Sequence, residues 1–279
     1  MRTTARRLLT SIGLGVSRLG LLVRRRSAVR ILYYHSISDD PIRSSVSPAA
    51  FAAQMEYLAR SQYCLLSLSD AVRRLASREP MPDRSVVVTL DDGFVDNYEH
   101  ALPILRRSGV PATVFLTVSY IGTDRLPTLS RTDFVPRPLS WEQVREMHRA
   151  GIEFGSHTLT HPMLSEVPLD RARLEIAESR RRIEDVLGVP VSLFCYPRGD
   201  YDDPVKQIVR DEGYVAACST LPGLNDWSAD LYALRRTYVS RRDTAGEFIK
   251  KVAGGYDVIQ TIAARWHQLR RRSAQRRPR

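Results

Sequence analysis

The sequence predicts an α/β fold in which parallel strands alternate with helices. Short apolar runs rich in Val, Ile, Leu and aromatic residues recur along the chain, and such runs are typical of buried strands. Segments with apolar residues at helical spacing separate most of them. This alternation implies right-handed crossovers between parallel strands, which either close as a barrel or spread as an open sheet. At 279 residues, the chain has room for one large domain of this kind or two small ones.

The predicted elements follow one another in a regular order. The first strand, Arg30–Tyr34, ends at His35. Further strands are predicted over residues 64–66, 86–90, 112–118, 191–196, 214–218 and 232–239. Later helices are predicted over residues 98–108, 140–150 and 169–187, and a long loop without periodicity over residues 119–139.

Local signals set the helix starts. Ser47 and Pro48 are typical of an N-cap followed by the first helical residue. Ser69 is the predicted N-cap of the next helix. Ser140, with Gln143 three residues later, resembles a capping box.

The three cysteines, Cys64, Cys195 and Cys218, are odd in number and far apart. Cys195 and Cys218 each lie in an apolar, strand-like run, which predicts buried thiols rather than bridges. The composition therefore does not indicate a disulfide framework.

The net charge of +11 belongs to the two ends of the chain. Residues 1–30 contain eight arginines and no acidic residue, and residues 265–279 contain seven and none. Removing these fifteen charges leaves −4 for the residues between them. Interleaved aromatic residues are absent from both ends except for Trp266, so a platform for stacking bases, and with it a nucleic-acid partner, is not expected.

The N-terminal segment also has a hydrophobic side. Its apolar residues recur near helical spacing, but the stretch Leu8–Val23 is shorter than the roughly 20 residues of a membrane span and contains Arg18. No small-residue cleavage site precedes the first strand. We expect a basic amphipathic helix on an anionic membrane surface, or alternatively a disordered or locally packed leader. The expected location is cytoplasmic, with peripheral attachment to the inner face of the membrane as a variant.

Two adjacent carboxylates end the strand over residues 86–90. Asp91 and Asp92 are followed by Gly93, and neighbouring strand residues point to opposite faces. A buried carboxylate without a partner is costly, so the pair is either solvated in an ordinary Asp-Gly turn or bound by a cation. These residues alone leave both readings open.

Two histidines four residues apart follow a later short strand. His157 and His161 can converge on one ion if the segment between them turns like a helix, although Pro162 disfavours helical geometry at His161. Imidazoles and a carboxylate suit zinc and neighbouring transition metals. One Asp and two His would leave coordination positions for water and substrate. The alternative is two unrelated surface histidines.

These two segments resemble the first two motifs of the polysaccharide deacetylase family (the NodB homology domain, similar to carbohydrate esterase family 4). Thr89–Gly93 resembles the first motif, and Ser156–His161 the second. The resemblance covers residues 31–255, with a motif core over 85–240. It implies an irregular (β/α)₇ barrel flanked by a basic extension over 1–30 and an Arg-rich tail over 256–279. It also implies that Asp91 is the general base and that Asp92, His157 and His161 bind a divalent metal, expected to be Zn²⁺ among the transition metals.

A third segment resembles the family's Arg-x-Pro-Tyr motif, but Cys195 stands in place of its Arg. The substrate and oxyanion contacts expected here are Tyr196, Pro197, Arg198 and Gly199. The backbone N–H of Arg198 can serve a developing oxyanion, while a plain Pro-Gly turn is the alternative. We expect Arg236 to orient Asp91 instead, since an arginine can bind a carboxylate through two parallel hydrogen bonds.

The family's general acid, a histidine near the C-terminal end, has no counterpart between His161 and His267. His35 is the available substitute, with a structural hydrogen-bonded histidine as the alternative. Asp226-Trp227 resembles a fourth motif by its letters, but we favour a loop anchor.

The resemblance implies metal-dependent removal of N-acetyl groups from amino sugars of a polysaccharide or a lipid-linked saccharide. A hydrolase of another amide or of an O-acetyl ester is the first alternative. A glycan- or nucleic-acid-binding protein without catalysis is the second, and the presence of Asp91 argues against it because a binding protein needs no base.

Overall fold

The computed structural model describes residues 27–40, 44–124 and 137–257. Most of the predicted N-terminal extension and all of the Arg-rich tail beyond Asp257 lie outside these ranges. The amphipathic helix, the membrane surface and the cytoplasmic location therefore stay predictions. Within the described residues, no helix has the length and apolar character that a membrane span requires.

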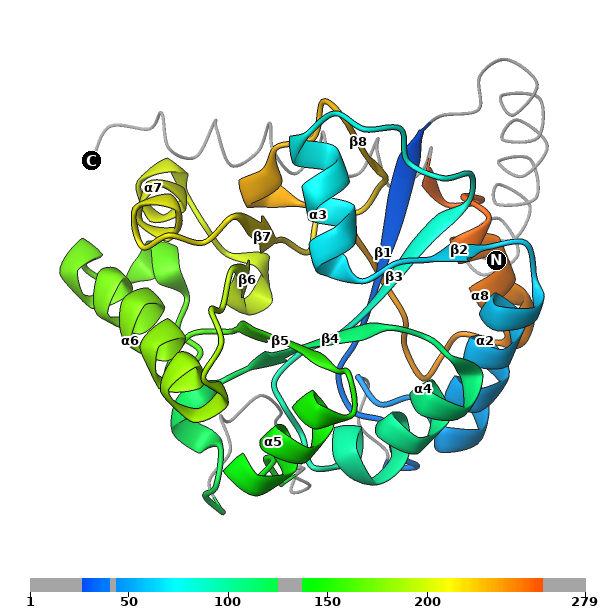
Figure 1. Ribbon diagram of the computed structural model, residues 1–279, viewed down its shortest axis with the longest axis horizontal. Helices are drawn as coiled ribbons and strands as arrows, with labels where there is room; N and C mark the ends of the chain where they lie inside the picture. Colours follow the sequence, from blue (N-terminus) through cyan, green and yellow to red (C-terminus); the bar gives the residue numbers. More distant parts are fainter. Residues whose placement is uncertain (1–26, 41–43, 125–136, 258–279) are drawn as a thin grey trace, which may run out of the picture.

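Parallel strands form a strongly curled sheet in the part of the chain that the structure describes (Figure 1). They are β1 (Ala28–Tyr34), β3 (Ser85–Leu90), β4 (Ala112–Leu116), β5 (Glu153–Ser156), β6 (Leu193–Cys195), β7 (Ala216–Cys218) and β9 (Arg236–Tyr238). The hydrogen-bonded order runs β7-β6-β5-β4-β3-β1, and β9 pairs with the free side of β1. A single parallel bridge from Cys218 to Leu234, just before β9, joins the two ends. Of the two predicted alternatives, the irregular barrel is thus confirmed and the open sheet is not.

Two short strands extend the amino end of this barrel. β2 (Cys64–Leu65) pairs with the start of β3, and β8 (Asn225–Asp226) runs antiparallel to the start of β1. Trp227 directly follows β8 and is 64% exposed. Since the other motif residues follow the carboxyl ends of their strands, Trp227 cannot line the same site.

With the exception of α3, the helices cover the outside of the sheet (Figure 1). They are α2 (Pro48–Arg60), α3 (Leu68–Ala76), α4 (Leu102–Ser108), α5 (Trp141–Arg149), α6 (Leu169–Leu187), α7 (Asp203–Asp211) and α8 (Ala245–Val252). The predicted caps at Ser47 and at Ser140 are confirmed. Ser69 is wrong as the cap of α3, because Ser67 accepts the N–H of Asp70 and Ser69 already lies in the first turn.

The helix α3 differs from the other helices because it closes the amino end of the barrel. Its apolar residues Leu68, Val72 and Leu75 pack in one cluster with inward-facing strand residues. These inward residues are Val29, Ile31, Val87, Phe115, Leu193 and Ala216. Figure 1 shows α3 lying across the ring of strands. The barrel therefore holds a packed apolar layer between α3 and its carboxyl end.

The predicted buried thiols are confirmed. Cys195 and Cys218 are buried and free, and Cys64 is free and half-buried. Their pairing across β6 and β7 brings the backbones of Cys195 and Cys218 side by side.

Candidate metal centre and catalytic residues

Buried polar residues from three strands converge at the carboxyl end of the barrel. Asp91 and Asp92 follow β3, His157 and His161 follow β5, and Arg236 begins β9. The apolar layer lies directly beneath them. Strand alternation explains this arrangement, because every second residue of each parallel strand points into the barrel.

Three side chains form a compact donor set. The Nε2 atoms of His157 and His161 each lie 3.6 Å from Oδ1 of Asp92. Two ligands about 2.1 Å from a tetrahedral zinc ion would lie about 3.4 Å apart. The separations therefore fit a shared divalent ion without large movements.

Hydrogen bonding leaves these donors directed at one another. His157 donates its Nδ1–H to the carbonyl oxygen of Cys195 at 2.7 Å, which orients its Nε2 lone pair toward Asp92. Oδ1 of Asp92 is buried and has no hydrogen-bond partner among the described residues. An unpartnered buried carboxylate oxygen is costly, and a cation would supply the missing partner.

The protonation of the donor set also suits a metal. Burial, followed by the charge of Asp91, raises the pKa of Asp92 to about 8. Burial lowers the pKa of His157 to about 4 and that of His161 to about 2. Both imidazoles are thus neutral at pH 7, which is the form that ligates metals, and a cation would stabilise the ionised form of Asp92. The residues present fit a divalent metal such as Zn²⁺.

The backbone around the site is unusual. Asp92, Thr158, His161 and Arg198 all have positive φ angles, between 56° and 76°. Non-glycine residues seldom adopt this region. The helical turn considered for the histidine pair is therefore wrong. The two histidines converge through a tight turn in which Thr158 Oγ1 accepts the N–H of His161 at 3.0 Å.

Arg236 binds Asp91 through two parallel hydrogen bonds. Nη1 lies 2.7 Å from Oδ1 and Nη2 lies 2.7 Å from Oδ2, and both side chains are almost fully buried. Burial alone would raise the pKa of Asp91, but the charge and hydrogen bonds of Arg236 lower it to about 2. Asp91 is therefore an ionised carboxylate at neutral pH, next to the donor set.

Further contacts hold the Arg236 guanidinium in place. Its Nε donates to the carbonyl oxygen of Ser219 at 2.9 Å, and its Nη1 donates to Thr89 Oγ1 at 3.2 Å. Its Cζ lies 4.3 Å from the centre of the Tyr33 ring. Cys195, which replaces the arginine of the family motif, has its Sγ 3.0 Å from Nη2. A small thiol at this position leaves the room that the guanidinium from β9 occupies.

A second group of donor atoms, from Asp91, His157 and Cys195, also lies within ligand distance. Both oxygens of Asp91 are already bound by Arg236. Burial also raises the pKa of the Cys195 thiol, which disfavours the thiolate that a metal would need. The first donor set is therefore the better metal centre.

His35 lies beside this site at the end of β1. Its ring centre is 5.8 Å from those of Tyr33 and Tyr238, and its Nδ1 has no hydrogen-bond partner among the described residues. Burial lowers its pKa. His35 is therefore a neutral imidazole at pH 7, which does not suit the role of a protonated acid.

The third motif contains a buried structural residue, Tyr196, and a turn at the edge of the site. Tyr196 is fully buried, stacks on Tyr201 and donates its hydroxyl to the carbonyl oxygen of Tyr232 at 3.0 Å. The expectation that Tyr196 contacts substrate is therefore wrong, because strand alternation points its side chain to the outer face of β6 and that of Cys195 to the inner face.

The residues Pro197–Gly199 form a tight turn after Tyr196. Arg198 is exposed, and its charge lowers the pKa values of Asp92 and His161. Gly199 has a positive φ of 67°, and a Cβ there would lie 2.1 Å from Thr220 Oγ1. Only glycine fits this close approach, so the turn that carries Arg198 is fixed at the rim of the site.

Glu175 is a residue that the sequence reasoning missed. It lies on α6, is fully buried, and accepts hydrogen bonds from both the backbone N–H (2.8 Å) and the hydroxyl (2.6 Å) of Thr160. Thr160 directly precedes His161, so this carboxylate holds the turn that presents the second histidine. An acidic residue between the buried positions Ala172 and Ile176 of α6 was the available signal.

Replacing Glu175 by glutamine is expected to raise the zinc dissociation constant about 10- to 100-fold, as loss of a partner that positions a ligand generally does. Glutamine keeps the shape but offers only one acceptor oxygen for the two donors of Thr160. Zinc titration against a competing chelator measures the effect.

The matched control is Glu178→Gln on the same helix, where the carboxylate faces Arg181 and Arg182 on the outside. Equal zinc affinities in the two folded variants would show that Glu175 does not position His161.

Comparison with known proteins gives one consistent family. A family model described as polysaccharide deacetylase matches residues 78–217. YxkH of Bacillus subtilis (strain 168), whose name carries the same description, is 30% identical over 211 residues, which cover 75% of this chain and 71% of that protein. The poly-beta-1,6-N-acetyl-D-glucosamine N-deacetylase of Staphylococcus aureus (strain MRSA252) is 28% identical over 156 residues, 56% of this chain. The chain matches half the length of that relative.

The fold is also similar to solved structures. The Streptococcus pyogenes deacetylase PplD superposes with a TM-score of 0.70 and 24% identity, covering 81% of this chain and 99% of that one. At this identity, the likeness establishes the shared fold.

Proposed function

This chain belongs to the polysaccharide deacetylase family, and from that premise we propose that it is a metal-dependent hydrolase that removes N-acetyl groups from amino sugars of a glycan. The observation that carries the proposal is that two neighbouring carboxylates have different partners. Asp91 is ionised and bound by Arg236, while Asp92 shares a donor set with His157 and His161. A base beside a metal centre is what hydrolysis of an amide by water requires.

Asp92, His157 and His161 would hold the metal. A bound Zn²⁺ polarises a carbonyl group and lowers the pKa of water from 15.7 to about 7. The neutral imidazoles and the tight turn of His161 keep the three donors in position for it.

Asp91 would take the proton of the attacking water. Arg236 fixes the plane of the carboxylate through both oxygens and keeps it ionised at neutral pH. The backbone N–H of Arg198, in the turn after β6, would donate to the oxyanion that forms from the acetyl carbonyl.

The leaving amine must then gain a proton. His35 is neutral at pH 7, whereas Asp91, once protonated, is a strong acid because Arg236 favours its ionised form. Asp91 would therefore return to the leaving nitrogen the proton that it took from water. The scission of the C–N bond then yields acetate and the free amine, with Asp91 again ionised.

The test is release of acetate from β-1,6-linked N-acetylglucosamine oligomers by the zinc-loaded protein. Chitin oligomers and an O-acetylated glycan complete the panel. We expect N-acetyl hydrolysis that stops after chelation and returns with added Zn²⁺. Release from the O-acetylated glycan alone would assign an esterase, and undiminished release after thorough removal of metal would overturn the proposed metal dependence.

A further inference from the structure

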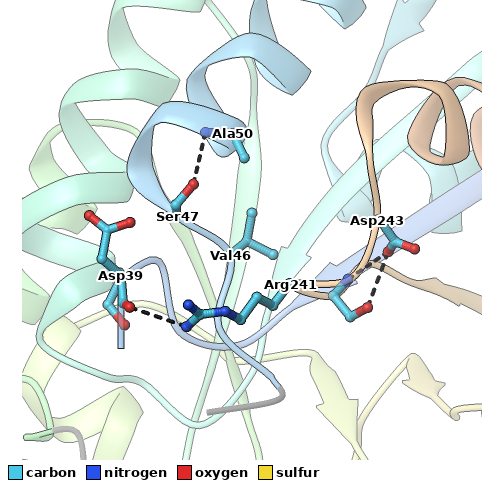
Figure 2. A pocket seen from close by; sticks show the side chains of 8 residues that line it. Asp39, Val46, Ser47, Ala50, Arg241 and Asp243 are labelled. Atoms are coloured by element: carbon cyan, nitrogen blue, oxygen red, sulfur yellow. Dashed lines mark hydrogen bonds between the residues drawn. The ribbon is translucent and has the colours of Figure 1, made fainter. Parts of the chain in front are cut away.

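Side chains tie together the segments that follow the strands at the carboxyl end of the barrel. One tie joins the segment after β9 to the segment after β1. There, Arg241 donates its Nη1 to the carbonyl oxygens of Asp39 (3.1 Å) and Asp40 (Figure 2). A second tie joins the segment after β6 to the segment after β5, where Asp200 binds Ser165.

The two segments of the second tie each carry one group of the site. The segment between β5 and α6 contains His161, a proposed metal ligand, and Ser165 comes four residues later. The segment between β6 and α7 contains Arg198, whose backbone N–H is the proposed oxyanion donor, and Asp200 comes two residues later. The contact between Asp200 and Ser165 therefore links the metal ligand to the oxyanion donor.

Asp200 binds both donor groups of Ser165. Its Oδ2 accepts the backbone N–H of Ser165 at 2.8 Å. The hydroxyl oxygen of Ser165 lies 2.9 Å from Oδ1 and 2.8 Å from Oδ2. Asp200 is only 4% exposed, and hydrogen bonds to a carboxylate are stronger than those between neutral groups. The tie is therefore a strong contact that is largely shielded from water.

The segment that holds Asp200 is fixed by its own contacts. The N–H of Asp200 donates to the carbonyl oxygen of Pro197 at 2.9 Å, which closes the turn of the oxyanion donor. On the other side of Asp200, the ring of Tyr201 stacks on that of Tyr196. The position of the carboxylate is therefore set by the segment after β6.

The segment after β5 depends more strongly on this tie. Within residues 162–167, all of which the structure describes, the backbone forms a single internal hydrogen bond. Leu164 packs in the apolar core. The other polar contacts that the structure shows for these residues run from Ser165 to Asp200. Without the carboxylate, this segment would lose its polar attachment to the segment after β6.

Both functional groups lie on backbone that needs such support. The φ angles of His161 and Arg198 are 61° and 56°, and non-glycine residues keep this conformation only where the surrounding structure holds it. Glu175, through Thr160, holds the chain before His161. Asp200 holds the chain after it.

We propose that Asp200 is a positioning residue, which fixes the spacing between the metal ligand His161 and the oxyanion donor at Arg198. The inference rests on the proposed function, because it assigns Asp200 a task in the same site. Stabilisation of an oxyanion requires its donors to be in place before the reaction. A misplacement of about 1 Å can lower the rate about 100-fold.

The experiment compares two substitutions of Asp200. Asp200→Ala removes the tie. Asp200→Asn removes the charge but keeps the hydrogen bonds, because the amide can accept the N–H of Ser165 and donate to its hydroxyl oxygen. The matched control is Asp202→Ala, two residues along, since Asp202 accepts the N–H of Val205 within its own segment.

The first measurement is acetate release at saturating Zn²⁺. We expect kcat of Asp200→Ala to fall about 100-fold with little change in KM, and Asp200→Asn to restore most of it. Asp202→Ala should lose thermal stability, as loss of a helix cap does, and keep the wild-type kcat. An unchanged kcat in Asp200→Ala, or an equal loss in Asp202→Ala, would overturn the positioning role. A loss in Asp200→Asn as large as in Asp200→Ala would assign the effect to charge and also overturn it.

Cobalt binding separates this inference from the proposed function. Co²⁺ can occupy sites of this kind, and its visible absorption reports the arrangement of the ligands. We expect this absorption to change in Asp200→Ala, with an affinity about tenfold lower, and to match the wild type in Asp200→Asn and Asp202→Ala. If the wild-type protein binds Co²⁺ but releases no acetate from any glycan, the proposed function fails, and the spectra alone decide whether Asp200 positions His161. Identical spectra and affinities in all four proteins would exclude it.

Discussion

Replacing Asp91 by asparagine is expected to lower kcat for acetate release by about two to four orders of magnitude, the usual contribution of a general base. Asparagine keeps the size of the side chain and one oxygen that Arg236 can still bind. It cannot accept the proton of the attacking water at neutral pH. Because Asp92, His157 and His161 are untouched, zinc binding should persist.

The control is Asp92→Asn, the same change one residue along. It should lose zinc affinity and activity together, whereas Asp91→Asn should lose activity alone. Asp91→Asn also leaves the buried Arg236 without its counter-charge, and breaking a buried ion pair commonly costs about 3–5 kcal/mol of stability. Zinc stoichiometry and circular dichroism of the purified variant therefore accompany the assay. Near wild-type turnover in the folded variant would remove Asp91 from the role of base.

Arg236→Lys is expected to shift the acid limb of the pH–rate profile to higher pH. Lysine keeps the charge but cannot form two parallel hydrogen bonds with a carboxylate. Burial raises the pKa of Asp91, and Arg236 counters this effect and lowers it to about 2. Because lysine lowers the pKa of Asp91 less than arginine does, this pKa rises, and Asp91 stays protonated up to a higher pH. The profile of log kcat against pH measures the shift.

The same variant should also lose stability in a defined pH range. The lowered pKa of Asp91 contributes stability that is fully present above its unfolded pKa of about 3.9 and is lost as the pH falls toward about 2. Arg236→Lys should therefore unfold at lower urea concentration at pH 6, and the difference from the wild type should narrow below pH 4.

The control is Arg235→Lys, one residue earlier, whose guanidinium binds the carbonyl oxygen of Pro222 instead. It should leave the pH profile in place. An identical profile for Arg236→Lys and the wild type would mean that Arg236 does not set the ionisation of Asp91.

The sequence predicted the strands that end in Asp91 and His157 because each strand carries its own local signature. Apolar runs mark a buried strand wherever it lies in the fold, and the ends of parallel strands meet by topology. Arg236 could be named because an arginine can bind a carboxylate through two parallel hydrogen bonds and because it lies in a predicted strand. The contact itself joins residues 145 positions apart, and no local pattern encodes it.

The errors have equally specific causes. Ser67 and Ser69 are both plausible caps, and only the hydrogen bond to the N–H of Asp70 separates them. The position of Tyr196 in the motif predicts a contact with substrate. Strand alternation, however, decides which side chain faces the site. Glu175 was passed over because acidic residues on a charged helix usually face solvent, and its partner Thr160 lies on another element.

The apolar layer and α3 close the amino end of the barrel, so that only its carboxyl end is open. Residues such as Val29, Ile31 and Phe115 fill the interior beneath Asp91, and Leu68 and Val72 of α3 seal the amino end. Among the described residues, Asp91 is therefore open to solvent from one side only. Under the proposed function, the glycan, the water and the acetate product would all share this opening, so that release of acetate would depend on movement of the glycan at the rim.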